Sequence, residues 1–308
     1  MSRTHRIIVA IAVMSVLLFA AGFLTAQYGD PAYLDAKYPL LARSILGDNS
    51  NDILINFVGL RMKLDGEFNQ LPTGTQKSFY FEYLPDGTDM SIGGDNELVA
   101  ASLIKVPLVM NLYRAAELHI INLDSAVTVS KSELDNDYGD LWKKGAGYKL
   151  TLRQAAALAL ERSDDTATHV IFDHVNGLLS PSQQSLASLD VDQDFTNDQA
   201  VITARAYISI MKGLYYASFL SMPDSETILS YLTMSTENKR LTADLPKKIV
   251  VAHKNGVNNT YWAESDCGIV YVPRRPYAIC VMVGLPDKQA DDFISKISKQ
   301  VYDYVVKQ

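Results

Sequence analysis

The pattern of apolar residues changes along this chain, and that change restricts the fold more than any other feature. Period-two patterns or short apolar runs bounded by turn residues predict strands over residues 78–84, 249–253, 268–272 and 277–284. Helical periodicity dominates the part between them, about residues 106–244, and predicts a closing helix over about 290–306. Strands at both ends that enclose a helical insert imply one sheet assembled from both ends of the chain. We therefore expect an α/β protein of the α+β type.

The bulk composition excludes several classes of protein. With 308 residues, 48% hydrophobic, the chain can bury a large core as one domain or as two interleaved lobes. The net charge is −7 and basic residues occur only in short pairs, so we expect no nucleic-acid partner. The five histidines are scattered, and we expect no metal and no cofactor.

The N-terminal segment has the pattern of an export or membrane signal. Arg3 and Arg6 precede residues 7–26, which are 20 residues without a charge. That length suits one membrane crossing better than the core of a signal peptide. Ala26 has the size needed before a cleavage site, but Leu24 fits its companion position poorly. We favour an uncleaved anchor over 1–26, with secretion after cleavage as the alternative, then a linker over 27–49 and a domain over 50–308. In both cases the domain is expected outside the cytoplasm.

A serine and a lysine three residues apart lie in the apolar segment 100–110. On a helix this spacing puts Ser102 Oγ and Lys105 Nζ on one face, as a nucleophile beside a possible base. Burial lowers the pKa of an amine, which a lysine base requires. Ser102 also follows a predicted hairpin and opens a helix, where backbone N–H groups are free to form an oxyanion hole. The same spacing recurs at Ser209 and Lys212, but in an ordinary amphipathic pattern.

Two further motifs follow in order, Ser163-Asp164-Asp165 at a helix boundary and Lys254-Asn255-Gly256 after an apolar strand. Each has an ordinary alternative: Ser163 and Asp165 are typical caps of the next helix, and Lys254-Asn255-Gly256 is compatible with a plain turn. We expect His253 to be a packed strand residue.

Together the three motifs resemble the Ser-x-x-Lys, Ser-Asp-Asn, Lys-Thr-Gly signature of class A β-lactamases and penicillin-binding proteins, over about residues 50–308. The resemblance implies a mainly antiparallel sheet flanked by helices. It places the α/β part at about 50–105 and 245–308, and an all-helical insert at about 106–244.

The resemblance also implies a role for each residue of the motifs. Ser102 would attack a carbonyl, Lys105 would accept its proton, and Ser163 would relay a proton to the leaving nitrogen. The substrate-binding residues would be Asp165, Lys254, Asn255 and Gly256. Within this set, Lys254 would bind a substrate carboxylate and lower the pKa of Lys105, and Gly256 would let the substrate backbone lie against the strand edge. The oxyanion hole would be the N–H groups of Ser102 and Val257.

The chain departs from the family pattern at several positions. No glutamate lies between Glu161 and Glu226, where class A β-lactamases carry the residue that activates the deacylating water. Asp165 replaces an asparagine, and its charge would hold Lys105 protonated. Asn255 replaces a threonine or serine, and Cys267 falls where many β-lactamases place an arginine. The missing glutamate favours slow deacylation, and the three substitutions favour either an altered substrate or an inactive relative.

The two cysteines, Cys267 and Cys280, flank a turn predicted at residues 273–276. That turn would put them on one face of a hairpin but offset diagonally, so a disulfide is compatible with the pattern and not required by it.

The leading hypothesis is an extracytoplasmic serine hydrolase of the class A β-lactamase-like group, which acts on a β-lactam or a peptidoglycan-type amide. The alternatives are a D,D-carboxypeptidase-like peptidase and a non-catalytic cell-wall-binding protein on the same fold.

Overall fold

The computed structural model describes Met14 and residues 36–42, 55–191, 194–196 and 199–307. Apart from Met14, the anchor predicted over 1–26 lies outside the described residues, as does most of the linker predicted over 27–49. Among the helices that are described, none has both the length and the apolar content needed to cross a membrane.

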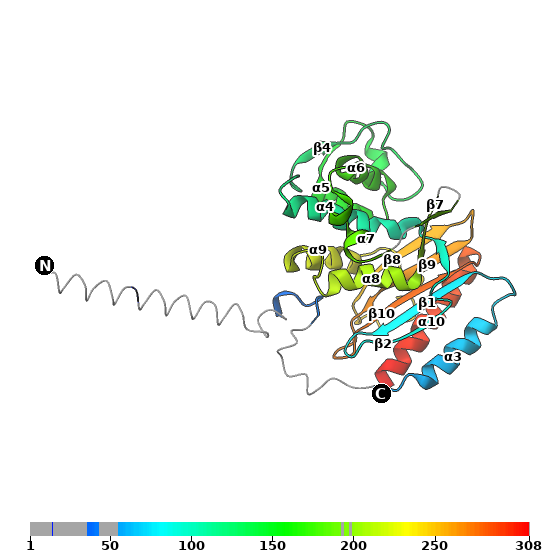
Figure 1. Ribbon diagram of the computed structural model, residues 1–308. Helices are drawn as coiled ribbons and strands as arrows, with labels where there is room; N and C mark the ends of the chain where they lie inside the picture. The colour runs from blue at the N-terminus through cyan, green and yellow to red at the C-terminus, as the bar shows by residue number, and fades with distance from the viewer. Residues whose placement is uncertain (1–13, 15–35, 43–54, 192–193, 197–198, 308) are drawn as a thin grey trace, which may run out of the picture.

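A five-stranded antiparallel sheet is built from both ends of the chain, as predicted (Figure 1). Its order is β2-β1-β10-β9-β8. The strands are β1 (Lys77–Tyr83), β2 (Thr88–Ile92), β8 (Val251–Asn258), β9 (Ala263–Val270) and β10 (Tyr277–Val283). The central pairing joins β1 to β10, with Phe81 opposite Ile279. The hairpin before Ser102 and the return of the chain to the sheet are thus confirmed.

Both strands of the β8–β9 hairpin are longer at its tip than the sequence predicts. Strand β9 begins at Ala263, five residues before the predicted start, because Glu264, Ser265 and Asp266 are all buried and paired with β8. Strand β8 runs through Lys254-Asn255-Gly256 to Asn258, so this motif lies inside a strand. The alternative interpretation of the motif as a plain turn is therefore wrong. A polar run gives no apolar alternation, which is why the sequence pattern ended both strands too early.

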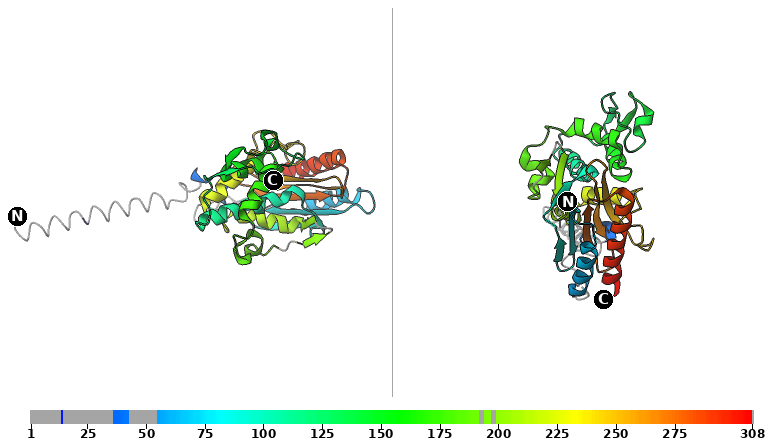
Figure 2. Two further views of the ribbon diagram at one scale, coloured as in Figure 1. Left: turned by 90° about the horizontal axis from the view of Figure 1, so that it is seen from above. Right: turned by 90° about the vertical axis from the view of Figure 1, so that its right-hand side faces the viewer.

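Helices cover both faces of the sheet (Figures 1 and 2). Helices α3 (Val58–Asn69) and α10 (Asp287–Lys307) lie side by side on one face and bury Leu60, Leu64 and Ile294 against it. Helices α8 (Ala204–Tyr215) and α9 (Met222–Thr233) cover the other face. The closing helix is confirmed, and it begins slightly earlier than predicted.

The insert is mainly helical and stands above the sheet in Figure 1. It consists of α4 (Lys105–Glu117), α5 (Leu152–Glu161), α6 (Asp165–Val175) and α7 (Ser185–Ser188), with α8 and α9 joining it to the sheet. The prediction of an all-helical insert missed four short strands: β4 (Ala126–Thr128), β5 (Lys149–Thr151), β6 (Asp194–Thr196) and β7 (Gln199–Thr203). Strand β7 pairs with β3 (Glu97–Val99), which leads directly to Ser102. Strands of three to five residues are too short to show a clear period in sequence.

Cys267 and Cys280 form a disulfide between β9 and β10. They lie directly opposite each other, so the predicted diagonal offset is wrong. The turn closes through a hydrogen bond from Arg275 N to Val272 O, one residue earlier than the predicted turn at 273–276, and this shifts the register of the hairpin. Cys267 is buried in the core between the sheet and the insert and is bonded to Cys280, so it has no free thiol.

Candidate active site

Ser102 lies where the chain turns sharply from β3 into a short 3₁₀ helix, η2 (Ala101–Ile104), which continues as α4. Ala101 has φ of 46°, a left-handed conformation that is costly for a residue with a Cβ. Residues three apart eclipse each other on a 3₁₀ helix, so Ser102 and Lys105 start from the same side of the segment. Ser102 is half-buried and Lys105 is buried.

The Lys105 amine points to the Ser163 corner. Its Nζ lies 2.6 Å from Ser163 O, 3.1 Å from Ser163 Oγ and 2.6 Å from Asp165 Oδ1. Within the described part of the chain, Lys105 makes no hydrogen bond to Ser102. The structure therefore brings the first two motifs together through the lysine and leaves the Ser102 hydroxyl without a hydrogen bond to it.

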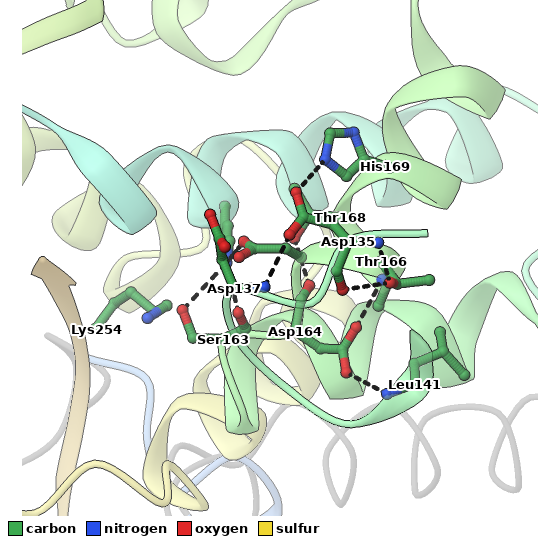
Figure 3. A network of polar contacts seen from close by, with 12 residues as sticks. Asp135, Asp137, Leu141, Ser163, Asp164, Thr166, Thr168, His169 and Lys254 are labelled. Carbon is green, nitrogen blue, oxygen red and sulfur yellow. Dashed lines mark hydrogen bonds and ion pairs between the residues drawn. The ribbon is translucent and has the colours of Figure 1, made fainter. Parts of the chain in front are cut away.

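The corner between α5 and α6 presents Ser163 and Asp165 to this amine. Ser163 has φ of 53°, and Asp164 caps α6 by accepting from Ala167 N at 2.8 Å. The other Asp164 oxygen accepts from Leu141 N at 2.8 Å, as Figure 3 shows. The helix cap is thus Asp164, and the alternative in which Ser163 or Asp165 caps the helix is wrong. Because Asp164 satisfies the helix end, Ser163 and Asp165 are free to bind Lys105.

Lys254 reaches the same place from β8, where its amine points toward the Ser163 hydroxyl in Figure 3. The side chain is fully buried, and Nζ donates to Asn255 O and Asn255 Oδ1, both at 2.9 Å. Burial, and then the charge of Lys105, lower the pKa of Lys254 to about 7. The charge of Lys105 thus disfavours the charged form of Lys254.

Burial is also the main influence on Lys105 and lowers the pKa of its amine. The carboxylate of Asp165 opposes this effect, through its charge and its hydrogen bond, followed by the charges of Asp164 and Asp135. The net direction is downward, which is the direction that a lysine base requires. Asp165 therefore restrains, but does not cancel, the effect of burial.

We expect the free energy of unfolding to rise with pH between about pH 7 and pH 10, in part because of Lys254. Unfolded lysine stays protonated to about pH 10.4, whereas folded Lys254 loses its proton near 7, so the unfolded state binds more protons in this window. If the unfolded state binds one proton more than the folded state, the folding equilibrium constant changes by up to about tenfold per pH unit. This stability is lost as the pH falls toward 7. Lys105, whose pKa is also lowered, contributes with the same sign.

Urea unfolding at pH 7, 8 and 9 measures this slope. Lys254→Met should flatten it, and Lys288→Met, which changes an exposed lysine on α10, should not. Equal slopes in the parent and in Lys254→Met would contradict the lowered pKa.

Gly256 brings β8 against η2. A Cβ at this position would lie 2.6 Å from Ser265 Oγ and 2.9 Å from Ala100 O, so the close approach of the two elements leaves no space for a side chain. The glycine thus has a packing reason within the protein itself, in addition to the substrate contact that the sequence suggested. Val257 follows on the same strand, so the two predicted oxyanion donors, Ser102 and Val257, belong to elements that pack together.

A cavity of about 180 Å³ opens beside this strand and is lined in part by Tyr138, Asn255 and Val257. Arg240, which the sequence reasoning missed, also lines it and is buried. The guanidinium has five partners: Asp291 at 2.7 Å, Gly256 O at 2.8 Å, Ser265 O at 3.0 Å, Glu264 at 2.5 Å and Asp287 at 3.1 Å. Residues 234–250 show no regular period, and nothing in the sequence links Arg240 to acids so far along the chain.

His253 is packed in the strand, as expected, and its Nδ1 lies 2.9 Å from Asp266 Oδ1. Asp266 also accepts from Leu241 N at 3.0 Å, so it ties the segment after Arg240 to β9. Both side chains are buried, and Asp266 lines the cavity.

Comparison with known proteins agrees with this geometry. In sequence, the chain is 22% identical over 219 residues to a β-lactamase of Proteus vulgaris (67% of this chain, 72% of the relative). It is 24% identical over 252 residues to an imipenem-hydrolysing β-lactamase of Enterobacter cloacae (76% and 82%).

In structure, the chain resembles PBP-A with a TM-score of 0.73 at 23% identity, covering 82% of this chain and 97% of PBP-A. A β-lactamase from Sphaerobacter thermophilus gives 0.73 at 21% identity, with coverage of 82% and 99%. These similarities show that the fold is shared. The model of the β-lactamase enzyme family matches residues 63–305, most of the described chain, and the protein therefore belongs to that family.

Proposed function

We propose that this protein is a serine hydrolase that forms an acyl-enzyme on Ser102, with a β-lactam or a peptidoglycan-type amide as the acyl donor. The observation that carries the proposal is the position of the Lys105 amine. The side chain of Lys105 is buried and starts one turn after Ser102. Its Nζ lies 3.1 Å from Ser163 Oγ. The proposed base and proton relay thus lie in contact, and the proposed nucleophile precedes the base by one turn of the same segment.

The residues divide the reaction between them as follows. Ser102 Oγ attacks the carbonyl carbon while Lys105, in its neutral form, accepts the hydroxyl proton. The N–H groups of Ser102 and Val257 stabilise the oxyanion. Ser163 passes a proton from the lysine to the leaving nitrogen, and the C–N bond breaks. Water then attacks the ester and releases the acid.

The last step is expected to be slow. A deacylating water needs a base, and the chain has no glutamate between Glu161 and Glu226. A variant of the similar PBP-A is known as an acyl-enzyme complex with penicillin G. By analogy, this chain should accumulate a penicilloyl ester, as a penicillin-binding protein does. We further propose, from the uncharged segment 7–26 alone, that the domain acts outside the cytoplasm and is tethered to the membrane.

The test is labelling of the purified protein with a fluorescent penicillin, followed by gel electrophoresis and intact mass. We expect one label per chain in the parent and in Ser209→Ala, and none in Ser102→Ala. Ser209 is a matched control because it precedes a second lysine at the same spacing, but Lys212 is bound to Glu82 at 2.8 Å. Labelling that survives Ser102→Ala would overturn the proposal.

The lifetime of the label separates the enzyme classes. Persistence over hours supports the penicillin-binding reading, and rapid loss with hydrolysed drug in solution supports a β-lactamase with a base other than glutamate. Release of D-alanine from a peptide that ends in two D-alanines would identify a D,D-carboxypeptidase.

One observation favours a second candidate, a non-catalytic cell-wall-binding protein. The ion pair between Lys105 and Asp165, at 2.6 Å, stabilises the charged lysine, which is not a base. A folded protein that is retained on peptidoglycan without labelling at Ser102 would support this candidate and refute the hydrolase.

A further inference from the structure

The cavity beside the proposed active site carries the wrong charge for a carboxylate ligand. It is lined by Asn255, next to Lys254, where the resemblance to the family places the carboxylate of the substrate. Its lining includes four carboxylates, from Glu237, Asp266, Asp287 and Asp291. Of the described residues, two cations line it, Arg240 and the exposed Lys239.

The buried cation of this cavity has no free capacity. Arg240 Nε and Nη2 bind the carboxylates of Asp291, Glu264 and Asp287, and Nη1 binds two backbone carbonyls. A guanidinium surrounded by three acids attracts an incoming anion weakly, because its charge is already balanced. Lys254 does not compensate, since its amine is fully buried and bound to Asn255 O and Oδ1. Asn255 in turn offers an amide where the family has a hydroxyl.

One carboxylate of this cavity has no hydrogen-bond partner among the described residues, and a second carboxylate close to it is only partly satisfied. The carboxylate of Glu237 lines the cavity and makes no hydrogen bond or ion pair with any described residue. Glu264 is 1% exposed, and its Oε1 has no hydrogen-bond partner within the described chain, although its Oε2 binds Arg240. Glu264 lies on the same face of β9 as Asp266, which lines the cavity. Glu264 itself does not line the cavity, so of these two carboxylates only Glu237 can receive an N–H group of a ligand there.

We propose that this cavity selects acyl donors with a neutral or positively charged hydrogen-bond donor, an amide or an ammonium group, where other substrates of the family carry a carboxylate. The inference rests on the proposed function and names the substrate class of that same site. Glu237 is the residue that sets the preference, because its carboxylate lines the cavity and makes no hydrogen bond or ion pair with a described cation, although its charge acts on Lys254.

The test uses two chromogenic cephalosporins that differ only at the ring carboxyl, one the free acid and the other its primary amide. The acylation rate of each compound is measured by intact mass with the full-length protein. It is divided by the rate at which hydroxide opens the β-lactam ring of the same compound, which corrects for intrinsic reactivity. We expect the amide to react faster by about tenfold or more, because one unbalanced charge within a few ångströms has an effect of this order. High salt should reduce the ratio.

Two variants assign the effect to the cavity. Glu237→Gln should reduce the ratio of amide to acid by about tenfold, because it removes the unpaired carboxylate and keeps the shape of the side chain. Asp292→Asn is the matched control: it removes an acid from α10 next to Asp291, but Asp292 binds Lys288 outside the cavity, and the ratio should not change.

The experiment distinguishes a failure of this inference from a failure of the proposed hydrolase function. An acid that reacts as fast as the amide, with a ratio that Glu237→Gln leaves unchanged, overturns the inference while the hydrolase stands. If neither compound labels Ser102, the hydrolase fails, and titration calorimetry of both compounds with Ser102→Ala still measures the preference. Tighter binding of the amide there supports the inference, whereas equal binding or no binding overturns it.

Discussion

Replacement of Lys105 by methionine is expected to lower the rate of acylation at Ser102 by about 10²–10⁴-fold, the usual contribution of a positioned base. Methionine keeps most of the volume of the side chain and removes the amine. Ser163 would then lose the amine that donates to its hydroxyl at 3.1 Å. The proton of Ser102 would have no base to accept it and pass it, through Ser163, to the leaving nitrogen. The measurement is the second-order rate of labelling by a penicillin, followed by intact mass.

Asp165→Asn should act in the opposite direction at neutral pH. Removing this carboxylate removes the largest influence that raises the pKa of Lys105, so a larger fraction of the lysine is neutral. The acid limb of the pH profile for acylation should therefore move to lower pH. Lys212→Met, at the second Ser-x-x-Lys spacing, is the control and should leave both rate and profile unchanged. If Lys105→Met acylates as fast as the parent, another group is the base.

Removal of the Arg240 guanidinium is expected to lower the free energy of unfolding by about 3–5 kcal/mol, as for other buried ion pairs that lose one partner. Arg240→Met would leave Glu264, which is almost fully buried, without its cation. Burial already raises the pKa of Glu264 and Arg240 opposes that shift, so the variant should fold with this carboxyl protonated. The two backbone carbonyls that accept hydrogen bonds from Arg240, Gly256 O and Ser265 O, would also lose this donor.

Urea denaturation of purified variants measures this effect. Adding Glu264→Gln to Arg240→Met should recover part of the loss, because the protein then no longer has to protonate a buried carboxyl in order to fold. Arg61→Met is the control: Arg61 pairs with Asp65 on the exposed face of α3, and its loss should cost less than about 1 kcal/mol. A loss of similar size for Arg240→Met and Arg61→Met would show that the buried network does not stabilise the fold.

Local patterns were enough to predict the main elements. Apolar alternation identified β1, a continuous apolar run identified β10, and a helical period identified α5 and α10. The helical period is visible because each helix buries one face against a core, and the apolar run is visible because β10 is buried at every position. The pattern failed at Glu264-Ser265-Asp266, where the buried face of the strand is polar. Burial of those residues depends on Arg240, 24 residues before Glu264.

The sequence by itself determined the family, the order of the three motifs and the residues that carry them, because the spacing of Ser102 and Lys105 and the types of residue at 163–165 and 254–256 are local properties. The tertiary structure alone decided their partners. It bound Lys105 to a corner 58 residues away, made Asp164 the helix cap, and surrounded Arg240 with acids from β9 and α10. The physical reason is that hydrogen bonds and charges act over a few ångströms in space, and only the packed backbone decides which distant residues come that close.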